Sequence, residues 1–158
     1  MNPSSAEAAF LAESLADLEK ALHHLQYSAA TCRSSAGFDA IPPEEQLIRV
    51  EAFTGRFARV VDILSKRVLR AIDQYEMNDP GTLLDIANRA EKRGLIDSAN
   101  WLREVREVRN QISHDYAGER LQDVMAYCQD QLANLTEACR RSINHAKNLI
   151  HPSAPQTR

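Results

Sequence analysis

Apolar residues that recur every three or four positions constrain this chain more than any other feature. The clearest run has seven of them at spacings of four, three, four, three, four and four. They are Leu121, Met125, Cys128, Leu132, Leu135, Cys139 and Ile143. This period places the side chains on one face of an α-helix, whereas a strand would alternate with a period of two. The pattern predicts a long helix that reaches about Ile150.

Two further long helices are predicted from the first half of the chain. The first opens with Ser4 and Glu7 in the spacing of a capping box and runs to about Ala30 or Cys32. The second opens with the proline pair at 42–43, because proline suits the first turn of a helix. Their apolar stripes are Leu11, Leu15, Leu18, Leu22 and Leu25, and then Leu47, Val50, Phe53, Phe57, Val60, Leu64 and Val68.

A short helix and a medium-length helix are predicted before the last long one. Thr82 and Asp85 can cap the short helix, and Gly94 ends it. Asp97 is expected to cap the next helix, whose apolar positions face the core over residues 101–112.

These elements predict an all-α fold, an antiparallel up-down bundle of four main helices plus one short helix. The chain has 158 residues, 44% of them hydrophobic, which suits a single domain with one core. We expect this domain to cover residues 1–150 and a disordered tail to cover residues 151–158.

The formal net charge of -3 excludes a protein that coats nucleic acid through overall positive charge. The charge is uneven, because residues 55–158 carry sixteen bases and fourteen acids. In the C-terminal half of the second helix, basic residues accompany a single acid: Arg56, Arg59, Lys66, Arg67 and Arg70 against Asp62. They predict either a solvated face or one wall of an RNA groove.

The sequence points to no metal, cofactor or membrane. Cys32, Cys128 and Cys139 are odd in number and widely spaced, which argues against a disulfide framework or a zinc site. We expect no signal peptide, and no apolar stretch is long enough to span a bilayer. We therefore expect a soluble cytoplasmic protein.

The densest set of chemically able side chains lies in the segment RNQISHDY, at the end of the medium-length helix. Arg109 is a permanent cation, and a histidine such as His114 can exchange protons near neutral pH. Asn110 and Ser113 add hydrogen-bonding groups, and Tyr116 adds a phenol. Each residue taken alone is more often structural than catalytic.

Helical geometry separates two of these residues. Arg109 and His114 would lie about 140° apart at ~100° per residue, whereas Tyr116 returns to the side of Arg109. Either the helix ends before His114, or two chains pool their residues across a symmetric interface.

The spacing of Arg109, His114 and Tyr116 resembles the R-x-x-x-x-H-x-Y motif of HEPN domains, specifically that of HepT-like toxins. The polar Asn110 after the arginine also fits. The resemblance covers roughly residues 80–118 and is architectural over the other helices. It implies a HEPN-like bundle that forms a homodimer, in which two motifs face each other in a cleft.

The resemblance also implies a metal-independent endoribonuclease of a type II toxin–antitoxin system. RNA carries its own nucleophile, the 2′-hydroxyl, so cleavage needs a group that moves protons and a cation that stabilises the phosphorane. By position, His114 would be the general acid or base and Arg109 would hold the scissile phosphate. Asn110 and Ser113 would support them.

HepT-like toxins pair with a small nucleotidyltransferase of the MNT type, which neutralises them. The motif tyrosine, here Tyr116, is the residue that this antitoxin adenylylates. A bulky, anionic AMP group beside Arg109 and His114 would exclude the RNA phosphate. The positive potential for RNA would come from few residues, which include Arg103 and Arg106.

Two other interpretations stay open on the sequence alone. The chain could be a non-catalytic HEPN-fold partner that presents substrate to, or regulates, a nucleotidyltransferase. It could also be a structural helical dimer without a site.

Overall fold

The computed structural model describes residues 2–32, 42–114 and 120–153, and within them the chain is helical and contains no strand. The elements are α1 (Ser5–Cys32), α2 (Glu44–Asp62), the π-helix η1 (Ile63–Val68), α3 (Leu69–Tyr75), α4 (Leu83–Lys92), α5 (Ala99–His114) and α6 (Leu121–Ile150). Because α2, η1 and α3 follow one another without a break, they form one continuous rod. The predicted all-α bundle is confirmed.

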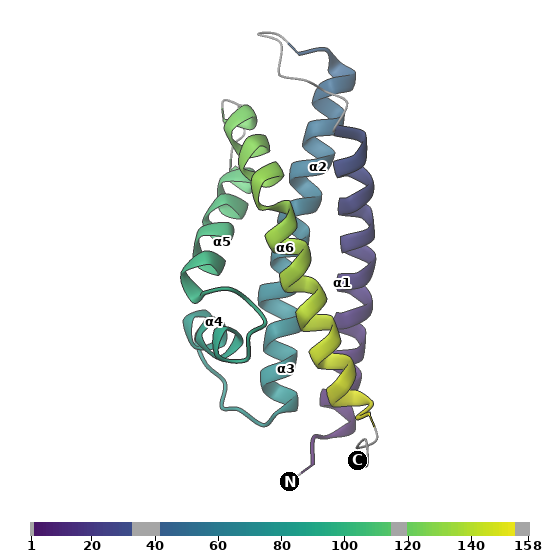
Figure 1. Cartoon of the computed structure of the whole chain (residues 1–158), viewed down its shortest axis with the longest axis vertical. Helices are drawn as coiled ribbons and strands as arrows, with labels where there is room; N and C mark the ends of the chain where they lie inside the picture. The colour runs from purple at the N-terminus through teal and green to yellow at the C-terminus, as the bar shows by residue number, and fades with distance from the viewer. Residues whose placement is uncertain (1, 33–41, 115–119, 154–158) are drawn as a thin grey trace, which may run out of the picture.

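Long helices that follow one another in the chain run in opposite directions (Figure 1). In this view α1 rises from the N-terminus, the α2–η1–α3 rod descends beside it, α5 rises again and α6 descends to the C-terminal end. The short α4 lies beside α3, at the end of the bundle that holds both termini. Of the predicted disordered tail, residues 154–158 lie outside the described residues.

Two of the predicted helix starts are confirmed by their hydrogen bonds. The backbone N–H of Ser4 donates to Glu7 Oε2 at 2.6 Å, and that of Glu7 donates to Ser4 Oγ at 3.2 Å. Thr82 and Asp85 form the same reciprocal capping box at the start of α4. Each box pairs backbone donors that have no acceptor within the helix, so the chain enters both helices at a defined residue.

The predicted cap of α5 is wrong by one residue. The backbone N–H of Trp101 donates to Ser98 Oγ at 2.9 Å, so Ser98 is the capping residue. Asp97 instead forms an ion pair with Arg141 of α6, with 3.1 Å between Oδ1 and Nη1. Asp97 and Ser98 both have side chains that suit a cap. Because Asp97 pairs with the distant Arg141, Ser98 caps the helix.

The apolar stripes meet in one core that includes residues from every helix. Phe53 and Phe57 of α2 are fully buried at its centre. Cys128 and Cys139 are also buried, as the stripe of the last helix predicted, and burial raises the pKa of each thiol to about 12. No helix among the described residues is both long and apolar enough to span a membrane.

The basic residues predicted on the second helix do not line one common surface. Arg56 donates to the carbonyl of His24 and to Ser28 Oγ, both on α1, at 3.1 and 2.6 Å. Arg67 forms an ion pair with Asp17, also on α1. These two cations therefore join the rod to α1, which argues against a basic wall made by all five residues.

A buried carboxylate fastens α4 to the rod. Asp73 of α3 is only 5% exposed, and its two oxygens lie 3.0 Å from Arg89 Nη1 and 2.7 Å from Arg93 Nη1. Arg93 also pairs with Glu76 at 2.6 Å, and Glu76 lies 2.8 Å from His145 Nε2 of α6. The short helix is thus held by charge as well as by apolar packing.

We predict that Asp73→Ala lowers the free energy of unfolding by about 3 kcal/mol, because it leaves two partly buried arginines without this carboxylate. Urea denaturation followed by circular dichroism measures the change. The control is Asp97→Ala, which breaks an exposed ion pair and should cost less than about 0.5 kcal/mol. Equal losses in the two variants would contradict a special role for the buried carboxylate.

Candidate functional site

Helix α5 carries every predicted site residue that the structure describes. They are Arg103, Arg106, Arg109, Asn110, Ser113 and His114. The helix packs on α2, with Leu102 and Val105 buried in the interface. It continues through His114, so the alternative in which the helix ends before this residue is wrong. Tyr116 lies outside the described residues.

Arg109 is turned toward the rod, where it binds Asp62, the last residue of α2. Its Nε and Nη2 donate to the same oxygen, Asp62 Oδ2, at 2.8 and 2.6 Å. Its Nη1 donates to Asn110 Oδ1 at 3.3 Å. Both side chains of the ion pair are about three-quarters buried. The predicted catalytic arginine is therefore held in one orientation by a carboxylate from another helix.

Two further cations surround the same carboxylate. Lys66 Nζ lies 3.3 Å from Asp62 Oδ1, close enough for an ion pair, although this buried oxygen accepts no hydrogen bond within the described part of the chain. Arg106 is half-buried, and its Nε has no hydrogen-bond partner among the described residues. Asp62, Lys66, Arg106 and Arg109 are called the Asp62 cluster below, and together they carry three positive charges and one negative charge.

Burial lowers the pKa of Arg106, the nearby Arg109 lowers it slightly further, and Asp62 opposes the shift. An arginine stays protonated at any physiological pH, so the cluster keeps its net positive charge. A partly desolvated group of cations with one carboxylate is suited to bind an anion such as phosphate.

The rod changes its winding directly after Asp62. Residues 63–68 form the π-helix η1, and the buried Ser65 donates from Oγ to the carbonyl of Val61 at 2.7 Å. Such a bond engages a main-chain carbonyl that an α-helix uses in its own ladder, and serines that bond in this way often bend helices. Single π-helical turns are frequent at functional sites.

His114 lies apart from the Asp62 cluster. Its side chain is exposed at the C-terminal end of α5, as is that of Ser113. No hydrogen bond joins His114 to Arg109 within the described residues. Arg103 is also exposed and donates to Asn100 Oδ1 at 2.7 Å, away from the cluster. The structure thus brings Arg106, Arg109 and Asn110 together and leaves the histidine outside.

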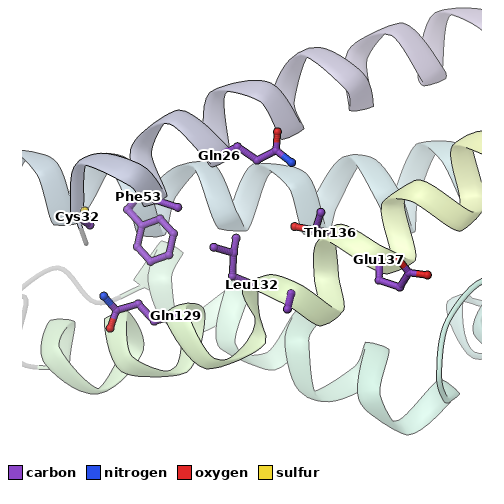
Figure 2. Close-up of a pocket in the computed structure, with 9 residues that line it drawn as sticks. Gln26, Cys32, Phe53, Gln129, Leu132, Thr136 and Glu137 are labelled. Carbon is purple, nitrogen blue, oxygen red and sulfur yellow. The ribbon is translucent and has the colours of Figure 1, made fainter. Parts of the chain in front are cut away.

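One groove lies elsewhere, between α1 and α6, with the ring of Phe53 at its floor (Figure 2). Its volume is about 720 Å³. The lining residues are Gln26, Ala29, Cys32, Phe53, Gln129, Leu132, Ala133, Thr136 and Glu137. None of them is a histidine, a lysine or an arginine, so this groove lacks the groups that would bind and cleave a phosphodiester.

In the sequence, Asp62 stands out only as the single acid among the bases in the C-terminal half of the second helix. Its ion pair spans 47 positions of sequence, which no local motif can reveal. The sequence signal was its position as the single carboxylate in a basic stretch. A carboxylate in such a place is expected to form an ion pair with a basic residue.

Comparisons with known proteins gave no match: no protein-family model, no curated protein and no solved structure matches the chain. Among the described residues, no group of three or more histidines, cysteines, aspartates or glutamates is arranged to hold a metal ion. The motif and the Asp62 cluster are therefore the features that bear on function.

We predict that the pair of Asp62 and Arg109 has a coupling energy of about 1 kcal/mol in the free energy of unfolding. A double-mutant cycle with Asp62→Ala and Arg109→Ala measures it, because the cycle isolates the pairwise term. The matched cycle on the exposed pair of Asp97 and Arg141 should give about 0.3 kcal/mol. Zero coupling between Asp62 and Arg109 would show that their contact contributes nothing to the fold.

Proposed function

We propose that this protein is a metal-independent endoribonuclease, a HepT-like toxin of the HEPN type that an MNT nucleotidyltransferase antitoxin neutralises. The observation that supports the proposal is the set of contacts that hold Arg109 in place. This motif arginine is held rigidly by Asp62 and Asn110, beside two further cations, on the helix that also presents His114.

The proposed reaction needs only the RNA, solvent water and these side chains. The 2′-oxygen forms a bond to phosphorus while the bond to the 5′-oxygen breaks, and a 2′,3′-cyclic phosphate results. One proton leaves the 2′-hydroxyl and one is added to the departing 5′-oxygen. His114 carries one of these transfers and a water molecule carries the other, and the Asp62 cluster stabilises the negative charge that develops on the phosphorane.

The positions of the two residues support the proposal of a homodimer. Arg109 faces α2, whereas His114 is exposed at the end of α5, so one chain does not present both to the same phosphate through direct contact. In a symmetric dimer with the two α5 ends facing each other, the histidine of one copy can approach the arginine of its partner. Exposure of His114 supports this arrangement.

We predict that the purified dimer cleaves RNA in the presence of EDTA. His114→Ala should lower the rate at least about 100-fold, because a positioned acid or base contributes that much. Arg109→Ala should lower it by about 100- to 1000-fold, because charge on the phosphorane is no longer stabilised. A gel assay with a labelled RNA measures the rates.

The control for these variants is His23→Ala, an exposed histidine of α1 that should leave the rate unchanged. An undiminished rate in His114→Ala would show that the histidine is not catalytic. Loss of the wild-type rate in EDTA would contradict the metal-independent mechanism.

We predict that an MNT-type nucleotidyltransferase with ATP adds AMP to Tyr116 and that the modified protein no longer cleaves RNA. The added phosphate competes for the cations that would hold the substrate. Mass spectrometry of the intact protein measures the gain. Tyr116→Phe should show no gain, whereas Tyr27→Phe, which removes an exposed tyrosine of α1, should be modified like the wild type. Modification of Tyr116→Phe would place the acceptor elsewhere.

A second candidate function is a non-catalytic HEPN-fold partner that presents substrate to, or regulates, a nucleotidyltransferase. Two observations favour it: the separation of His114 from the Asp62 cluster and the net charge of -3. The two assays discriminate, since this partner would be modified on Tyr116 but would leave RNA intact.

A further inference from the structure

Asp62 is the residue that connects the motif to the rest of the fold, although it lies outside the motif. We propose that Asp62 is a positioning residue for RNA cleavage, which acts by orienting Arg109 toward the scissile phosphate. This inference rests on the proposed function and names one more residue of the same site. Asp62 itself touches the arginine and does not need to touch the RNA.

Asp62 and Asn110 do not use all the N–H donors with which Arg109 could bind a phosphate. A guanidinium group has five N–H bonds. Nε uses its single one on Asp62, Nη2 uses one on Asp62, and Nη1 uses one on Asn110. Within the described part of the chain, one N–H therefore remains on each of Nη1 and Nη2, and two such donors can bind a phosphate in a bidentate manner. The carboxylate fixes the group and leaves these donors available.

Charge explains why a carboxylate is needed at this place. Lys66, Arg106 and Arg109 would repel one another without an anion between them, and Arg106 is already partly desolvated. With Asp62 present, the three cations stay together at the α2–α5 contact and keep a net positive charge. Without it, we expect Arg109 to leave its position and to sample several rotamers.

The same geometry allows an opposite role, in which the ion pair locks Arg109 and competes with RNA. The two remaining donors of Arg109 favour positioning over locking. The roles predict changes of opposite sign in kcat, so kinetics decides between them.

The experiment compares Asp62→Asn, Asp62→Glu and the wild-type dimer in steady-state cleavage of a short RNA. Loss of orientation should lower kcat about 10-fold in Asp62→Asn, since small misplacements of a catalytic group are costly. Its KM should stay level or fall, because removal of a negative charge favours RNA binding. Asp62→Glu keeps the charge but moves it by one methylene group, and it should also lower kcat.

A second comparison separates positioning from a merely structural role. If Asp62 acts through Arg109, adding Asp62→Asn to Arg109→Ala should not lower kcat further, whereas a general loss of structure would add to the defect. The matched control is Asp97→Asn, the same substitution in another ion pair between separate segments, which should leave kcat and KM unchanged. Circular dichroism melting checks that each variant is folded.

The kinetic outcomes separate positioning, locking and failure of the proposed function. A kcat equal to or above that of the wild type in Asp62→Asn overturns positioning, and a higher value supports the lock. A wild-type kcat in Asp62→Glu, or additive losses with Arg109→Ala, overturns it as well. A wild-type dimer that does not cleave RNA overturns the proposed function itself, and that result differs from all the others.

Discussion

Burial of the α2–η1–α3 rod is the constraint on which the rest of the structure depends. Its α2 segment contacts α1, α5 and α6, and its later segments contact α1 and α4, so the rod must be apolar around most of its circumference. The fully buried side chains of Phe53, Phe57 and Leu64 contribute to this apolar surface. Each polar residue on such a rod needs a specific partner, because an unpaired charge there loses hydration without compensation. Asp62 and Asp73 are the clearest cases: Asp62 binds Arg109 of α5, and Asp73 binds two arginines at the end of α4.

Local patterns in the sequence predicted most of the fold, because helix period, capping boxes and apolar stripes are properties of adjacent turns. The Thr82 box and the burial of Phe53 are examples. Long-range choices were not predictable in the same way. Asp97 was expected to cap α5, but its contact with Arg141, 44 positions away, leaves that position to Ser98. The π-helix was missed because the apolar stripe through Leu64 and Val68 reads as an ordinary α-helix.

The candidate site shows the same division between local and distant information. The motif on α5 could be read directly, and the angle between Arg109 and His114 followed from helix geometry. The contact between Arg109 and Asp62 could not, because it depends on how α5 packs along α2. A scaffold of this kind gives a catalytic side chain a fixed backbone and a fixed hydrogen-bond partner, which are the two conditions for preorganised electrostatics. Exposure of His114 is consistent with the proposed dimer, in which this residue would have to be accessible to another copy.

The burial of the cysteines has a practical consequence. Cys32, Cys128 and Cys139 are all buried, and burial raises the pKa of each thiol, so each stays protonated and shielded at neutral pH. Thiolate is the reactive form, and a native background of this kind leaves maleimide and spin-label reagents little to modify. A cysteine introduced at exposed Glu107 would therefore be labelled selectively without removal of the native ones. Distances between two such labels would map how the α5 helices of two copies are arranged in solution.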